Sequence, residues 1–289
     1  MKKQKTARLM LIVAMAIFGT IGLFVQHIGV SSGELALYRA VMATILIGLY
    51  LIITGNKISF QNIKKDVPLL LASGMAMGIN WILLFEAYKH TTVLLTTLTY
   101  YFAPVIVTVV CPILFKEKMT VKQIICFIMS TLGIVMITGI GDLTVSGTNI
   151  IGILFALGAA ILYATVILIN KFIKGVEGIH RTFLQFLAAI IILVPYVAVT
   201  SGINLRMLDS IGWGALLIVG IVHTGITYCL YFSALKDLPG QNVAMLSYID
   251  PLVAIIVSVT FLNESMTVIQ AIGGVLILGF TFLNEVKSS

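Results

Sequence analysis

Residues 114–123 read LFKEKMTVKQ, and residues 261–270 read FLNESMTVIQ. The two stretches share Glu, Met, Thr and Gln at the same spacing, at an offset of 147 residues. The same offset pairs three more motifs without a gap: GINW at 78–81 with GITY at 225–228, FEA at 85–87 with FSA at 232–234, and YFAP at 101–104 with YIDP at 248–251. Self-similarity at a fixed offset predicts two structural copies. We place them at residues 1–141 and 145–289.

The composition of both copies is that of a membrane protein. Of the 289 residues, 60% are hydrophobic and only 10% are charged, and the mean hydropathy is +1.11. A typical soluble domain carries about 25% charged residues. Too few charges are present to solvate the surface of a protein this large. The composition therefore excludes a soluble enzyme, a nucleic-acid-binding domain and a disordered chain.

Ten segments are long and apolar enough to cross a bilayer, for which a helix needs about 20 mostly apolar residues. They cover residues 7–26, 34–54, 68–88, 92–114, 121–140, 149–170, 181–200, 210–235, 241–262 and 267–284. The first resembles a signal peptide, but it has no evident small-residue cleavage site, so we interpret it as the first span. The predicted fold class is an all-α polytopic membrane protein with ten transmembrane helices.

The positive charges predict the orientation of these spans. With the amino terminus inside, 15 of the 18 Lys and Arg residues lie on the cytoplasmic side, two lie outside, and Arg39 lies within the second span. Lys and Arg concentrate in cytoplasmic loops of membrane proteins. We therefore expect an integral protein of the plasma membrane with both termini cytoplasmic. The net charge of +7 then reports topology, and no nucleic-acid partner is needed to explain it.

An odd number of spans in each copy gives the two copies opposite orientations. Each copy has five predicted spans, so the second enters the membrane from the other side. Inverted repeats recur in secondary transporters, which hold the substrate near the midplane between the repeats. Channels are also built in this way, so a channel remains an alternative.

The repeated motifs carry a resemblance to a known family. They are Phe85, Ala87, Ala103, Pro104 and residues 114–123 in the first copy, and Phe232, Ala234, Pro251 and residues 261–270 in the second. Together with Arg39, this pattern resembles the repeat of the EamA-type transporters of the drug/metabolite transporter superfamily. The resemblance implies ten helices, cytoplasmic termini, a central cavity and a small-molecule substrate. Some members of that family export amino acids and related metabolites, and others carry small organic cations.

Asp250 is the acidic residue that stands out, because it lies near the centre of the ninth predicted span. A charge at that depth costs roughly 2.5–3.5 kcal/mol on insertion scales, so it is expected to face a cavity or a partner. Pro251 follows directly and breaks the backbone hydrogen bonding, as Pro104 does in the fourth span. Ser247 shares the helical face of Asp250. We interpret Asp250 as a substrate or proton site, and the alternative is a buried structural aspartate.

Aromatic and polar residues of several spans are candidates for the cavity wall. They are Asn80, Trp81, Tyr100, Tyr101, Tyr228 and Tyr248. Aromatic faces suit amphipathic amino acids or cations, and the alternative is simple helix packing. Arg39 contacts either a carboxylate on another helix or the carboxylate of a substrate. His223 is either a proton relay or a hydrogen-bonded packing residue.

Glu117 and Glu264 match the family motif, but each lies at a helix end just before a threonine, Thr120 or Thr267, that suits an N-cap. We assign both carboxylates a structural role at the helix ends. No zinc or nucleotide motif is present, so we predict neither an enzyme nor an ATP-driven pump, and no cofactor or metal.

The main hypothesis is a secondary transporter that exports amino acids or related amphipathic metabolites by alternating access around a midplane cavity. The proton is a candidate coupling ion. An organic-cation transporter is the alternative. The sequence leaves the oligomeric state open.

Overall fold

The structure is a computed structural model that describes residues 2–55, 63–115, 120–138, 147–176, 178–235, 237–238 and 246–285. All regular structure in these ranges is helical, so the all-α prediction is confirmed. The helices are α1 (Lys2–Gly19), α2 (Ile21–Val25), α3 (Ser32–Ile53), α5 (Val67–His90), α6 (Val93–Tyr100), α7 (Ala103–Phe115), α8 (Val121–Thr138), α9 (Gly147–Asn170), α10 (Gly178–Thr200), η1 (Leu205–Met207), α11 (Ser210–Leu217), η2 (Ile218–Ile226), α12 (Thr227–Leu235), α14 (Ile249–Thr260) and α15 (Val268–Glu285).

Within these ranges, seven helical segments are long and apolar enough to span a membrane. They are Lys3–Val25, Ser32–Ile53, Val67–His90, Val93–Val110, Asn149–Asn170, Gly178–Thr200 and Ser210–Leu235. Three shorter apolar helices, Val121–Ile137, Ile249–Thr260 and Val268–Leu283, coincide with the fifth, ninth and tenth predicted spans. The chain is therefore an integral membrane protein, and the count of ten crossings stays a prediction.

Several of the spans are interrupted rather than continuous. Thr20 separates α1 from α2, and its hydroxyl donates to the carbonyl of Ile17 at 2.8 Å. Tyr101 and Phe102 separate α6 from α7, just before Pro104, whose ring removes a backbone donor. In the segment Ser210–Leu235, η2 is a π-helix of nine residues. Irregular backbone at membrane depth is tolerated where protein or a water-filled cavity satisfies it.

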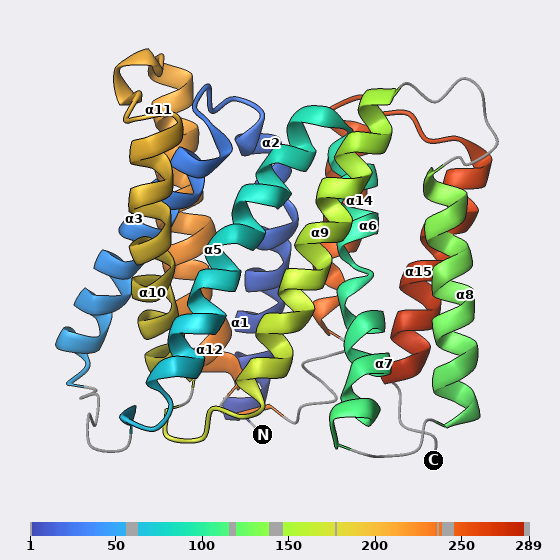
Figure 1. The fold of residues 1–289 in the computed structure, drawn as a ribbon, viewed down its shortest axis with the longest axis horizontal. Helices are drawn as coiled ribbons and strands as arrows, with labels where there is room; N and C mark the ends of the chain where they lie inside the picture. The colour runs from blue at the N-terminus through green and yellow to red at the C-terminus, as the bar shows by residue number, and fades with distance from the viewer. Residues whose placement is uncertain are drawn as a thin grey trace.

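The helices of the first half pack against those of the second. α5 packs on α9 and α10, and in the corresponding way α12 packs on α1 and η2 packs on α3. α1 and α9 run in opposite directions, and α1 begins at the end of the bundle where α15 ends (Figure 1). Buried residues of α3, α5, α10 and η2 form the largest hydrophobic cluster.

α8 and α15 form a closely packed pair at one side of the bundle (Figure 1). A Cβ added to Gly133 would lie 2.6 Å from the carbonyl oxygen of Gly273, and a Cβ added to Gly273 would lie 2.7 Å from that of Gly133. Small residues let helix backbones approach closely in membranes, where lipid tails are as apolar as leucine. These two glycines therefore set the spacing of the pair.

Candidate functional site

A central cavity of about 510 Å³ lies between the two halves of the chain. Its walls come from α1, α2, α3, α5, α6, α7, α9, α10, α12, α14 and the residues just before α14. Ligand pockets in proteins usually measure about 300–1,000 Å³. The cavity can therefore hold a small metabolite.

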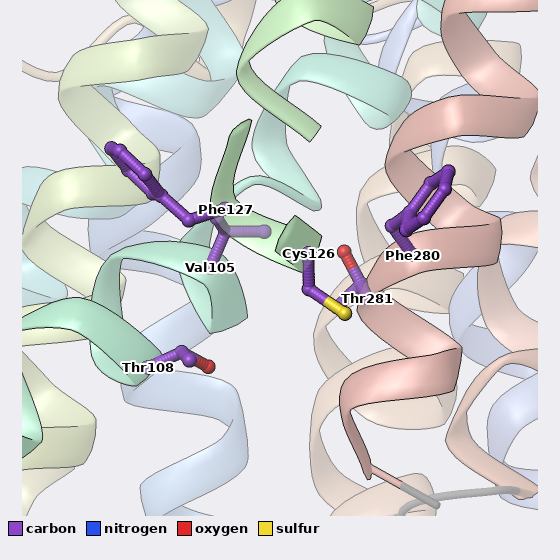
Figure 2. A pocket seen from close by; sticks show the side chains of 6 residues that line it. All are labelled: Val105, Thr108, Cys126, Phe127, Phe280 and Thr281. Carbon is purple, nitrogen blue, oxygen red and sulfur yellow. The ribbon is translucent and has the colours of Figure 1, made fainter. Parts of the chain in front are cut away.

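A second hollow lies between α7, α8 and α15 and is far smaller. Figure 2 shows its lining side chains, which include Cys126 on α8 and Thr281 on α15. Its volume of about 10 Å³ has room for roughly one water molecule. This hollow is a packing gap, and of the two the central cavity is the one large enough for an organic substrate.

Asp250 lines the central cavity from the first turn of α14. The hydroxyl of Tyr101, at the break between α6 and α7, donates to Asp250 Oδ2 at 2.6 Å. On the neighbouring α1, a Cβ added to Gly19 would lie 2.5 Å from the carbonyl oxygen of Asp250, so only a glycine leaves room there. Ser247 and Tyr248 line the cavity beside Asp250, whereas Pro251 is buried outside the lining.

Arg39 lines the same cavity from α3 and is only 4% exposed. Its Nε donates to Thr224 Oγ1 at 2.9 Å. Its Cζ lies 4.5 Å from the ring centroid of Trp81 and 5.5 Å from that of Phe85, which are cation–π distances. In the described part of the chain, Arg39 forms no ion pair. The structural ion pair that the sequence left as an alternative is therefore not formed among these residues.

Aromatic side chains form much of the remaining wall. They are Trp81, Tyr88, Tyr100, Tyr101, Tyr163, Tyr228, Tyr231, Tyr248, Phe18 and Phe232. Tyr100 stacks on Tyr163 with ring centroids 5.3 Å apart, and Tyr228 meets Phe18 edge to face at the same distance. The sequence analysis did not select Tyr163 as a site residue. In this part of the chain an offset of 145 residues pairs it with Phe18, which also lines the cavity, so an alignment of the two copies at that offset points to both residues.

Two residues expected at the site, Asn80 and His223, are not among the residues that line the cavity. Asn80 is buried, with 2% of its surface exposed, and its Nδ2 donates to the carbonyl of Ala159 on the neighbouring α9 at 2.5 Å. The hydroxyl of Tyr100 approaches Asn80 Oδ1 at 3.5 Å. His223 is 1% exposed, with Nε2 2.9 Å from Thr20 Oγ1 and Nδ1 3.3 Å from the carbonyl of Ile218.

A polar cluster that was not expected from the sequence also lines the cavity. Gln185 Nε2 donates to Asn170 Oδ1 and to Ser73 Oγ, each at 2.7 Å, and Arg181 Nη1 donates to the carbonyl of Asn170 at 3.2 Å. Asn170, Arg181 and Gln185 all line the cavity, where α9 ends and α10 begins. Scattered polar residues at helix ends carry no sequence signal that separates them from ordinary loop residues.

Glu264 caps a helix other than its own. Its Oε1 accepts from the amide of Val93 at 2.8 Å and its Oε2 from the amide of Leu94 at 2.9 Å, at the amino terminus of α6. Thr267 caps its own helix, because the amide of Gln270 donates to its hydroxyl at 3.2 Å.

The first copy has the equivalent threonine cap. The amide of Gln123 donates to the hydroxyl of Thr120 at 3.2 Å. The two threonine caps predicted from the sequence are therefore confirmed. Glu117, which was expected to have a structural role at a helix end, lies outside the described residues.

Pro104, the proline expected to break the fourth span, lines the cavity near the start of α7.

Comparison with known proteins also finds two copies in this chain. The model of the EamA-like transporter family matches residues 5–139 and again residues 150–285. The chain is 32% identical over 288 residues to an uncharacterized transporter, YxxF, of Bacillus subtilis, an alignment that covers 99% of this chain and 91% of that one. It is 30% identical over 151 residues to the threonine/homoserine exporter RhtA of Escherichia coli, covering 52% and 50%.

A solved crystal structure has the same fold. It matches with a TM-score of 0.67 over 96% of each chain, at 17% sequence identity. At that identity the likeness is one of fold alone. The relatives from Bacillus subtilis and Escherichia coli are named as transporters, not as enzymes.

Proposed function

Because the chain belongs to the EamA-like transporter family, we propose that it exports amino acids or related small amphipathic metabolites across the cell membrane by secondary active transport. The observation that carries this proposal is the central cavity, which is built by both halves and is lined by a half-buried carboxylate among aromatic rings. The half-chain similarity to a threonine/homoserine exporter supports the choice of amino acids.

The proposal includes ten spans in two inverted copies, residues 1–141 and 145–289, with both termini in the cytoplasm. The family model matches twice, once in each copy. The opposite directions of α1 and α9 and the reciprocal packing of α5 and α12 support the inversion. The distribution of Lys and Arg supports the orientation.

In this proposal Asp250 binds the ammonium group of the substrate or a coupling proton. The Tyr101 hydroxyl holds the carboxylate at 2.6 Å, and the tyrosine rings and Trp81 enclose the rest of the substrate. Ammonium groups bind well to aromatic faces as well as to carboxylates. Rocking of the two halves would expose this cavity to the two sides of the membrane in turn.

An organic-cation transporter is the second candidate, because the same carboxylate and rings suit a quaternary ammonium ion. A channel is less consistent with a substrate-sized cavity lined by a buried charge. Saturable exchange distinguishes both kinds of transporter from a channel.

Counterflow into proteoliposomes tests the proposal. Vesicles loaded with one unlabelled compound are given the same compound in labelled form, using threonine, homoserine, other small amino acids and tetramethylammonium. We expect saturable counterflow of at least one amino acid, and a loss of at least about tenfold in apparent affinity for Asp250→Asn. Asp237→Asn, an equal change of charge at an exposed loop residue, serves as the control. Absence of counterflow for every compound would contradict the proposal.

A further inference from the structure

We propose that Arg39 is a second charged anchor of the cavity and that the substrate is a zwitterion. Its carboxylate would bind the Arg39 guanidinium while its ammonium group binds Asp250. The inference rests on the proposed transport function and narrows its substrate class. It separates amino acids from organic cations, which Asp250 and the aromatic rings alone do not.

The guanidinium is held in a fixed orientation at the cavity wall. Thr224 accepts from Nε at 2.9 Å, and the Thr224 hydroxyl itself donates to the carbonyl of Val219 at 2.9 Å in the π-helix η2. Trp81 lies 4.5 Å from Cζ and is braced edge to face by Phe186, with ring centroids 5.2 Å apart. Two elements of different halves thus fix the plane of the guanidinium.

The terminal amino groups of Arg39 are left for a ligand. The hydrogen bonds recorded for Arg39 among the described residues use Nε alone, and no carboxylate in those ranges lies within ion-pair distance. Nη1 and Nη2 are the pair of donors that binds a carboxylate side-on. A buried arginine without an anion is unfavourable in a membrane protein. A substrate carboxylate in the cavity would supply the missing charge.

Asp250 supplies the complementary charge on the other half of the chain. Arg39 is on α3 of the first half and Asp250 is on α14 of the second, and both line the same cavity. The rings of Tyr88, Tyr100 and Tyr228 line the cavity as well. A zwitterion satisfies both charges at once, whereas a quaternary ammonium ion satisfies Asp250 and is repelled by Arg39. A negative and a positive charge that line one cavity from different halves of the chain therefore favour a substrate that carries both charges.

Three compounds that differ in one group each test this assignment. Threonine carries both charges, threoninol has a hydroxymethyl group in place of the carboxylate, and 3-hydroxybutyrate lacks the ammonium group. Competition against the amino acid that gives the strongest counterflow measures their apparent affinities for the wild-type protein, Arg39→Gln and Asp250→Asn. If threonine itself does not compete, the alcohol and deaminated analogues of that amino acid take the place of the threonine analogues.

For the wild type, we expect both single-charge analogues to compete about 100-fold more weakly than the zwitterion. Arg39→Gln should lower the apparent affinity for the zwitterion by a similar factor. The apparent affinity for the alcohol should stay within about threefold of the wild-type value, because the alcohol has no carboxylate for Arg39 to bind. Asp250→Asn should lower the apparent affinity for the zwitterion and leave that for the deaminated acid within about threefold of the wild-type value. Residual transport by the two variants is followed at raised substrate concentration.

Controls keep the result interpretable. Arg206→Gln makes the same change of charge at an exposed residue of η1 and should leave all affinities unchanged. If Arg39→Gln does not fold, Arg39→Lys keeps the charge and loses the side-on geometry, and it should weaken the zwitterion but not the alcohol.

The inference is overturned if Arg39→Gln weakens the alcohol and the zwitterion equally, or if tetramethylammonium competes as well as the zwitterion. In either case saturable counterflow would still stand, and the proposed transport function with it. Absence of any counterflow by the wild type would instead contradict the transport proposal.

Discussion

Replacing Glu264 by alanine should destabilise the protein by removing the cap of a helix in the other half of the chain. Glu264 accepts from the amides of Val93 and Leu94 at 2.8 and 2.9 Å, and Thr92 accepts from the amide of Leu95 at 3.1 Å. These three amides of the first turn of α6 have no partner within the helix. The carboxylate therefore satisfies two of them and also carries a negative charge at the positive end of the helix.

The size of the effect follows from these contacts. Each hydrogen bond to a charged group contributes about 1.5–3 kcal/mol, but Glu264 is half-buried, so water can replace part of the loss. We expect Glu264→Ala to lower the free energy of unfolding by about 2 kcal/mol, within the range measured for lost helix caps. At roughly 2–4 °C per kcal/mol, the thermal midpoint Tm falls by about 4–8 °C.

Thermal unfolding in detergent, followed by circular dichroism, measures this change. Glu264→Gln keeps an acceptor oxygen and loses the charge, so its Tm should lie between those of the wild type and the alanine variant. Asp237→Asn, at an exposed loop residue, should leave Tm unchanged. A Tm for Glu264→Ala within about 1 °C of the wild type, a margin of about half a kcal/mol or less, would refute the capping argument.

The remaining predictions concern three other contacts. Tyr101→Phe removes the hydrogen bond to Asp250, and the apparent substrate affinity in counterflow should change by about fivefold, the equivalent of about 1 kcal/mol. Gly273→Leu should lower Tm by several degrees because it forces α8 and α15 apart, whereas Gly279→Leu on the same helix meets open space and should not. His223→Gln should leave the pH profile of transport unchanged, since His223 does not line the cavity; a flattened profile measured by counterflow between about pH 5 and 8 would restore it as a proton relay.

Some long-range contacts of the site could not have been read from the sequence. Tyr101 and Asp250 are 149 residues apart, and Val93 and Glu264 are 171 apart. From the sequence, Tyr101 was expected at the cavity wall as an aromatic residue, and Asp250 was expected there separately, as a carboxylate near the centre of a predicted span. It placed Glu264 at its own helix end, and only the packed bundle brings that carboxylate to α6.

The sequence did not show which side chains of a helix point into the cavity and which point toward a neighbouring helix. Trp81 and Asn80 are neighbours on α5, and both were expected at the cavity. Trp81 lines it, whereas Asn80 donates to the carbonyl of Ala159 on α9. In a soluble helix the polar face marks the outside, but here the outside is lipid, which is as apolar as the protein interior. Hydrophobic periodicity therefore does not reveal how each helix is rotated.

By itself, the sequence determined the class of protein and its all-α architecture, because apolar length and charge distribution respond to the bilayer and not to any partner helix. It also carried the repeat and the two threonine caps, which depend on residues three apart. The tertiary structure decided which polar groups meet. It placed Arg39 against Trp81 and Thr224, Asp250 against Tyr101, and Asn80 away from the cavity. Those contacts depend on the rotation and spacing of packed helices, which glycines such as Gly19 and Gly273 fix only once their neighbours are in place.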